Sequence, residues 1–249
     1  MRHRDDPALS PMRVAGRDAS AGSLAEAHSR QVELVGRDLA CHRGERPVFR
    51  GISFRLASGA ALAVTGANGS GKSSLLRLLA TLLRPQTGQL LWGSTPVWRD
   101  PASYRARLHY VGHLDAIKPA LSAREMLRSW AVLRGVATPS RSRIDAALAA
   151  FALETAADWP CRWLSAGQRR RLALARLLVS PAPIWLLDEP SAGLDGDGQE
   201  RLEQAIAAHL AAGGRIVVAT HLPIAIAAAT MLTLDAFRAT ADAMRADAF

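Results

Sequence analysis

Lysine, cysteine and long apolar runs are all scarce in this chain of 249 residues. The longest near-apolar run, residues 222–234, has 13 residues, whereas a helix needs about 20 to cross a bilayer. The two cysteines, Cys41 and Cys161, form neither a metal-ligand spacing nor a disulfide framework, which favours a reducing cytosol. We therefore expect a chain that meets a membrane only through a partner.

The net charge of +9 raises the question of a nucleic-acid partner. Lys72 and Lys118 are the only lysines among 31 cationic residues, and the arginines are scattered rather than clustered. This bias is typical of a GC-rich genome, so we expect no nucleic acid to bind. The apolar share of 49% and the charged share of 21% indicate a globular domain with a sizeable core.

The order of apolar patterns predicts an α/β fold with a helical insert. Strands are expected at 31–40, 48–57, 61–66, 183–188, 215–220 and 230–234. Helices are expected from Ser122 to Gly135, from Pro139 or Ser142 through residue 153, at 166–179, and from Gln199 to Ala212. Ser122 and Glu125 form a possible capping box for the first of these helices.

One domain is expected at 31–240, with its helical subdomain at about 114–175 and tails at 1–30 and 241–249. The first tail is rich in Arg, Ala and Ser and lacks the apolar core of a signal peptide, which favours disorder. A transit peptide is an alternative that its acidic residues disfavour, and a start at Met12 is another.

A glycine-rich stretch follows the strand expected at 61–66 and fits the P-loop pattern G-x-x-x-x-G-K-[ST]. It comprises Gly66, Ala67, Asn68, Gly69, Ser70, Gly71, Lys72 and Ser73, and Ser74 extends it. Its backbone N–H groups and the following helix N-terminus would bind phosphate oxygens. Lys72 would contact the β- and γ-phosphates, and the Ser73 hydroxyl would ligate Mg²⁺. The strand before and the helix after disfavour a chance glycine turn.

Two acidic residues end the strand expected at 183–188. Asp188 is the expected Mg²⁺ carboxylate of a Walker B element, and Glu189 can orient and deprotonate an attacking water as general base. Alone, the pair would be two solvated acids at the end of a strand. Together with an upstream P-loop it predicts hydrolysis of a nucleoside triphosphate.

The segment Leu164-Ser165-Ala166-Gly167-Gln168 lies after the helical insert and offers hydroxyl and amide donors at a helix N-terminus. It resembles the "LSGGQ" signature of ATP-binding cassette (ABC) ATPases. In the same family order, "SAGLD" resembles the D-loop, with Asp195 near the dimer interface. "ATH" places His221 where the family's switch histidine contacts the γ-phosphate. The resemblance covers about residues 32–235.

This resemblance implies a P-loop NTPase fold that binds ATP and Mg²⁺ in a head-to-tail homodimer. Ser165, Gly167 and Gln168 would close on ATP that is bound by Lys72 of the partner copy. Closure would move attached membrane subunits, and hydrolysis at Glu189 would reopen the dimer. The basic run at 169–171 is expected on the exposed face of the signature helix.

Two positions depart from the common ABC pattern. Arg43 stands where an aromatic residue usually stacks on adenine, and a guanidinium plane can also stack on a base. His113 stands where a glutamine usually senses the γ-phosphate and faces the membrane subunit. An inactive site is one interpretation of His113, but the intact Lys72, Glu189 and His221 argue against it.

The segment "YVGHLDAIKPALSAREML" (110–127) resembles "Y-x-G-H-x-x-x-x-K-x-x-L-[ST]-x-x-E-N-L" of the ATP-binding subunits of cytochrome c maturation complexes. The resemblance implies a haem-export ATPase on the cytoplasmic face of the bacterial inner membrane, bound to an integral membrane ABC subunit and acting with other maturation proteins. It would drive haem delivery or release of the haem-loaded chaperone.

Two alternatives remain open for the cargo and the setting. An ABC exporter subunit for another cargo fits the same motifs. A soluble ABC ATPase acting on nucleic acid or ribosomes is disfavoured, because such proteins usually carry two cassettes or a long coiled-coil insert.

Overall fold

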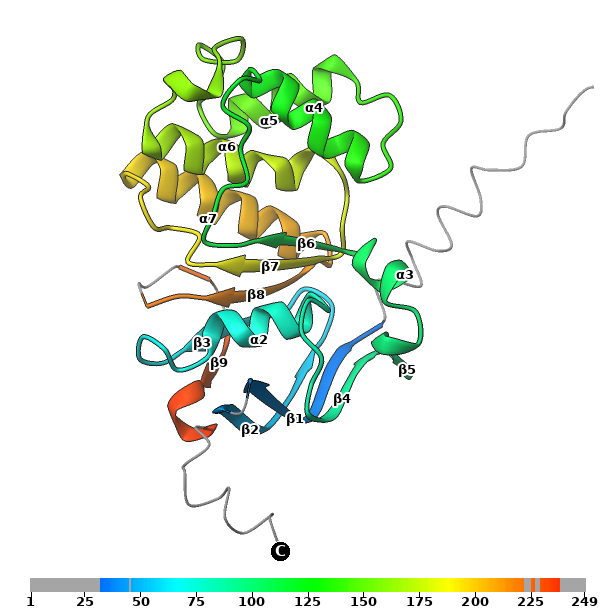
Figure 1. Cartoon of the computed structure of the whole chain (residues 1–249). Helices are drawn as coiled ribbons and strands as arrows, with labels where there is room; N and C mark the ends of the chain where they lie inside the picture. The colour runs from blue at the N-terminus through cyan, green and yellow to red at the C-terminus, as the bar shows by residue number, and fades with distance from the viewer. Residues whose placement is uncertain (1–31, 45, 222–224, 227–228, 238–249) are drawn as a thin grey trace, which may run out of the picture.

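The computed structural model describes residues 32–44, 46–221, 225–226 and 229–237. It contains a four-stranded antiparallel sheet in the order β2-β1-β4-β5 and a five-stranded parallel sheet in the order β6-β7-β8-β3-β9 (Figure 1). The tails predicted at 1–30 and 241–249 lie outside the described residues. Within the described part, no helix combines the length and the apolar character needed to cross a membrane.

The parallel sheet is buried on both faces along its central strands, whose side chains alternate between two hydrophobic cores, whereas its edge strand at 230–233 is mostly exposed. Its members are β3 (Ala61–Thr65), β6 (Leu108–Val111), β7 (Ile184–Asp188), β8 (Arg215–Ala219) and β9 (Thr230–Thr233). On β7, Trp185 and Leu187 join one core, whereas Ile184 and Leu186 join the other. Successive side chains of a strand point to opposite faces, so a short continuous apolar run is what a doubly covered strand requires.

The first core lies between the parallel sheet and the long helices drawn above it in Figure 1. These helices are α4 (Ala123–Leu133), α5 (Arg141–Ala150), α6 (Ala166–Val179) and α7 (Gly196–Ala211). Their first residues follow capping side chains, and the capping box predicted at Ser122 and Glu125 is confirmed. Gly135 comes just after α4 and has a backbone conformation in the left-handed region, with a φ of 84°.

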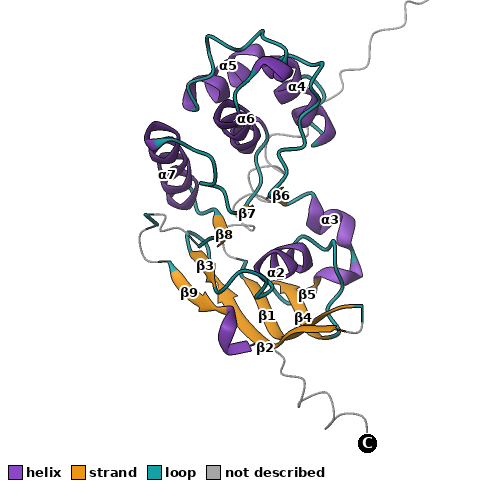
Figure 2. Cartoon of the chain, turned by 60° about the vertical axis from the view of Figure 1, so that its left-hand side comes forward, coloured by secondary structure: helices purple, strands orange, loops and turns teal. Residues whose placement is uncertain are grey.

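The second core lies on the opposite face, where α2 (Lys72–Leu79) packs between the two sheets (Figure 2). The antiparallel sheet consists of β1 (Leu34–Arg43), β2 (Arg46–Leu56), β4 (Thr87–Trp92) and β5 (Thr95–Pro96). The shorter elements are η1 (Val97–Arg99), α3 (Pro101–Arg105), η2 (Cys161–Trp163) and η3 (Leu234–Phe237).

Two predicted helix starts were wrong by a few residues. Helix α5 begins at Arg141, because the hydroxyl of Ser140, not Ser142, accepts a hydrogen bond from the Arg143 N–H. Helix α7 begins before Gln199, because Asp195 accepts from the Gly198 N–H at 2.9 Å. In both cases a small polar side chain satisfies an N–H group that lacks a partner within the helix.

Candidate active site

The loops that carry most of the predicted site residues leave the parallel sheet at the carboxyl ends of its strands. The P-loop follows β3, Asp188 ends β7 and Glu189 comes directly after it. His221 follows β8, and His113 follows β6. Parallel strands present their carboxyl ends at one edge, which is where open α/β sheets bind ligands. The topology therefore gathers segments that lie far apart in the sequence.

The P-loop has the backbone shape that its glycines predict. Gly66, Gly69 and Gly71 have φ values of 142°, 80° and 105°, and α2 starts immediately after Gly71. A Cβ added to Gly71 would lie 2.5 Å from a methyl carbon of Val48, so β2 approaches too closely for any side chain there. The free N–H groups at this helix start provide an anion-binding concavity.

Side chains of the P-loop and α2 converge on the same place. The Lys72 ammonium donates hydrogen bonds to the carbonyls of Gly66 and Ala67 at 2.8 and 3.2 Å. Ser70 and Ser74 are buried, and among the described residues the Ser70 hydroxyl has no hydrogen-bond partner. A buried ammonium and an unpartnered hydroxyl beside a glycine-rich loop suit phosphate oxygens, which accept hydrogen bonds.

Ser73 and Asp188 form the oxygen pair predicted to hold Mg²⁺. The Ser73 hydroxyl donates to Asp188 Oδ1 at 3.2 Å, and Asp188 is buried. Burial raises the pKa of the Asp188 carboxyl, while the Ser73 hydrogen bond and the charge of His113 oppose that rise. A buried carboxylate beside a hydroxyl fits a hard divalent cation.

The described residues contain no group of three or more His, Cys, Asp or Glu side chains that could hold a metal. Mg²⁺ is usually bound by one or two protein ligands together with water and substrate phosphates. A site of only Ser73 and Asp188 therefore suits this ion.

Glu189 and His221 are brought together from neighbouring strands. Glu189 Oε2 lies 2.9 Å from His221 Nδ1 and accepts from the His221 backbone N–H at 3.3 Å. The Glu189 side chain is 16% exposed and that of His221 is 55% exposed. Glu189 also has a φ of 46°, the left-handed region that non-glycine residues avoid. This pair places a carboxylate and an imidazole at the sheet edge where the P-loop begins.

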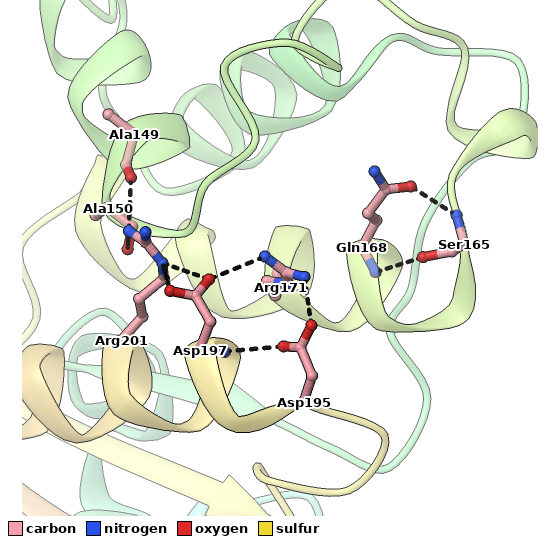
Figure 3. A network of polar contacts seen from close by, with 9 residues as sticks. Ala149, Ala150, Ser165, Gln168, Arg171, Asp195, Asp197 and Arg201 are labelled. Atoms are coloured by element: carbon pink, nitrogen blue, oxygen red, sulfur yellow. Dashed lines mark hydrogen bonds and ion pairs between the residues drawn. The ribbon is translucent and has the colours of Figure 1, made fainter.

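The signature segment forms a second capping box at the start of α6 (Figure 3). The Gln168 N–H donates to the Ser165 hydroxyl at 3.1 Å, and the Ser165 N–H donates to Gln168 Oε1 at 2.9 Å. Among the described residues, no hydrogen bond joins Ser165, Gly167 or Gln168 to the P-loop. The described part of the chain thus has two helix starts, at α2 and α6, that no hydrogen bond connects.

The D-loop is tied to the signature helix by Arg171 (Figure 3). The Arg171 guanidinium forms ion pairs with Asp195 at 3.0 Å and with Asp197 at 3.4 Å. Asp197 also pairs with Arg201, which donates to the carbonyls of Ala149 and Ala150 at the end of α5. The network connects α5, α6 and α7 beside the D-loop.

The expectation that the whole run at 169–171 is exposed was wrong. The Arg170 side chain is only 6% exposed, and that of Arg171 is 16% exposed. Arg170 donates to main-chain carbonyls at the ends of β6 and β7. Spacing within the helix could not predict this, because the acceptors come from distant segments. The only sign in the sequence of the buried role of Arg170 was its place in a run of three arginines on one helix.

Arg43 and His113 are both exposed. Arg43 ends β1 opposite Arg46 of β2, the strand whose Val48 touches the P-loop. His113 lies close enough to Asp188 for its charge to lower the pKa of that carboxyl.

Asp235 is a residue near the P-loop that the sequence analysis did not single out. Its carboxylate accepts a hydrogen bond from the P-loop N–H of Ala67 at 3.2 Å.

These features define a P-loop NTPase, and comparisons with known proteins narrow the class. The family model described as ABC transporter matches residues 49–192. An ABC transporter ATP-binding protein from Pyrococcus furiosus superposes with a TM-score of 0.74 at 23% identity, covering 83% of this chain and 100% of that one. A dimeric ATP-binding cassette in a post-hydrolysis state, bound to ADP and Pi, superposes with a TM-score of 0.68 at 24% identity. The match covers 76% of this chain and 88% of that one.

Curated relatives share a higher sequence identity with this chain than these two structures do. The cytochrome c biogenesis ATP-binding export protein CcmA of Rhodospirillum rubrum is 56% identical over 204 residues, 82% of this chain and 86% of that protein. The chain belongs to the ABC transporter family and, within it, to the cytochrome c biogenesis ATP-binding export proteins. It is therefore an ATP-binding and ATP-hydrolysing subunit. The resemblance drawn from its motifs is confirmed.

Proposed function

We propose that this ATPase drives haem delivery, or release of the haem-loaded chaperone, during cytochrome c maturation. It would act as a peripheral subunit on the cytoplasmic face of the inner membrane, bound to an integral ABC subunit and working with other maturation proteins. The Rhodospirillum rubrum relative is named a cytochrome c biogenesis ATP-binding export protein, which supports a role in cytochrome c maturation. The single observation that carries the motor role is the gathering of the Ser73–Asp188 and Glu189–His221 pairs at one sheet edge.

Residues 31–240 would act as one ATPase domain, with the helices at about 114–175 as a subdomain. The backbone N–H groups of Gly66 to Ser74 and the Lys72 ammonium would hold the phosphates of ATP. Ser73 and Asp188 would hold Mg²⁺, which neutralises phosphate charge when bound. Arg43 would stack on the adenine.

Glu189 would take a proton from the attacking water, and His221 would orient that carboxylate and contact the γ-phosphate. The 2.9 Å contact between Glu189 Oε2 and His221 Nδ1 supports this pairing. A carboxylate within hydrogen-bond reach of the water is what general-base catalysis requires.

Two copies would bind two ATP molecules head to tail. Ser165, Gly167 and Gln168 at the start of α6 would close on ATP held by the partner's P-loop. In the part of the chain that the structure describes, no hydrogen bond joins them to the P-loop of the same chain, which favours this arrangement. The dimeric state of the ADP-bound cassette of similar fold also supports it.

His113→Ala is expected to leave ATP binding within about threefold of wild type but to uncouple hydrolysis from the membrane partner. His113 is exposed just after the carboxyl end of β6, and among the described residues no hydrogen bond joins it to the P-loop, so its loss should spare the phosphate-binding loop. Nucleotide titration and ATPase assays, with and without the partner, would measure both effects. Complete loss of ATP binding would contradict this placement of His113.

A haem-stained gel of membranes from a deletion strain tests the cargo. Wild type is expected to restore covalent cytochrome c bands, whereas Glu189→Gln should not, because haem delivery would need ATP turnover. Bands that persist in the deletion strain without a second copy would favour export of another cargo. Copurification would then identify the membrane partner.

A further inference from the structure

We propose that Arg170 is a positioning residue that holds the main chain around Glu189 in its active shape and links it to the signature helix. The inference rests on the proposed role of Glu189 as general base. It corrects the expectation that this arginine is a solvated residue on the helix surface.

The guanidinium of Arg170 is saturated with hydrogen bonds. An arginine has five N–H donors, and here each has an acceptor. The acceptors, with donor-to-acceptor distances, are Pro190 O (3.2 Å), Gly112 O (3.1 Å), Asp115 Oδ1 (3.1 Å), Asp188 O (3.0 Å) and Glu189 O (2.6 Å). Asp115 supplies the counter-charge, so the buried cation is paired as well as hydrogen-bonded.

Three of these acceptors are the consecutive carbonyls of residues 188–190. Carbonyl oxygens that converge on one point repel each other unless a cation lies between them. The turn also holds Glu189 at a φ of 46°, a conformation that is unfavourable for a non-glycine residue. Arg170 therefore stabilises a backbone shape that Glu189 would otherwise leave.

The same guanidinium binds both sides of His113, through Gly112 O and Asp115. Arg170 itself lies in the early turns of α6, the helix that Ser165 caps. One side chain thus connects the helix start that faces the partner copy, the loop of His113 and the turn of Glu189. A shift of α6 on dimer closure would reach the general base through this contact.

Arg170→Met in the full-length chain within its membrane complex is the test. We expect kcat to fall about 10- to 100-fold, because a general base displaced by about 1 Å loses rate on this scale. The KM for ATP should change less than threefold, since none of the hydrogen bonds of Arg170 to described residues reaches the P-loop. Arg170→Lys should recover only part of the rate, because an ammonium has three donors and cannot reach five acceptors.

Arg201→Met is the matched control. Arg201 also donates to two carbonyls and pairs with a carboxylate, but it contacts neither Glu189 nor the His113 loop. The kcat of Arg201→Met should stay near wild type.

A double variant separates positioning from general stability. Combined with Glu189→Gln, Arg170→Met should cause no further loss of kcat, because Arg170 acts through Glu189.

The outcomes separate this inference from the proposed function. If Glu189→Gln hydrolyses ATP like wild type, the general-base assignment fails. If Glu189→Gln is inactive but Arg170→Met keeps the wild-type kcat, or the two losses multiply, only the role of Arg170 is overturned. Should Arg170→Met not fold, Arg170→Lys decides: a lower kcat at unchanged ATP affinity supports the role, and an unchanged kcat overturns it.

Discussion

Glu189→Gln is expected to lower ATP hydrolysis by about 10²- to 10⁴-fold, the contribution typical of a general base. The amide keeps the size of the side chain but cannot accept the proton of the attacking water. The amide oxygen can still accept a hydrogen bond from the backbone N–H of His221, as Glu189 Oε2 does at 3.3 Å. The backbone turn and the Ser73–Asp188 pair are unaffected by this change, so ATP binding should persist.

A chain that binds ATP but cannot cleave it should accumulate in the closed state. ATP favours closure only while it is intact, so the population shifts toward the head-to-tail dimer. Sedimentation in ATP and Mg²⁺ would measure the dimer, and single-turnover assays would measure the rate. Glu200→Gln, an exposed glutamate on α7, is the control that should behave as wild type. A Glu189→Gln chain that stays monomeric in ATP would argue against a composite site.

Lys72→Ala is expected to abolish productive ATP binding. The Lys72 ammonium is buried and lies on the P-loop carbonyls of Gly66 and Ala67, where phosphates would bind. Removing one partner of a buried, hydrogen-bonded charge pair costs roughly 2 to 5 kcal/mol, which is more than tenfold in Kd. Calorimetric titration with a non-hydrolysable ATP analogue would measure the loss.

The chain offers a natural control for this variant in its only other lysine. Lys118 is exposed in the loop before α4, so Lys118→Ala should leave ATP affinity unchanged. If the assembled complex with Lys72→Ala turned over ATP as wild type does, the P-loop assignment would be wrong. A thermal melt of each variant would show whether the fold is kept.

Local patterns account for what the sequence predicted well. The capping box of Ser122 and Glu125 closes over three residues, so the residue types and their spacing suffice to predict it. The P-loop is similar, because glycines at fixed offsets set the backbone angles of the loop they form. The predictions failed where the signal was weak: β4 and β6 were not predicted, and the starts of α5 and α7 were misplaced.

By itself, the sequence determined the phosphate-binding loop, the order of the motifs and the family, because these depend on neighbouring residues and on spacing along the chain. Only the tertiary structure decided that His221 lies beside Glu189, that Ser73 reaches Asp188 and that Arg170 is buried. These contacts join residues on different strands and helices. The packing of a parallel sheet against helices, not any local pattern, brings their side chains within hydrogen-bond distance.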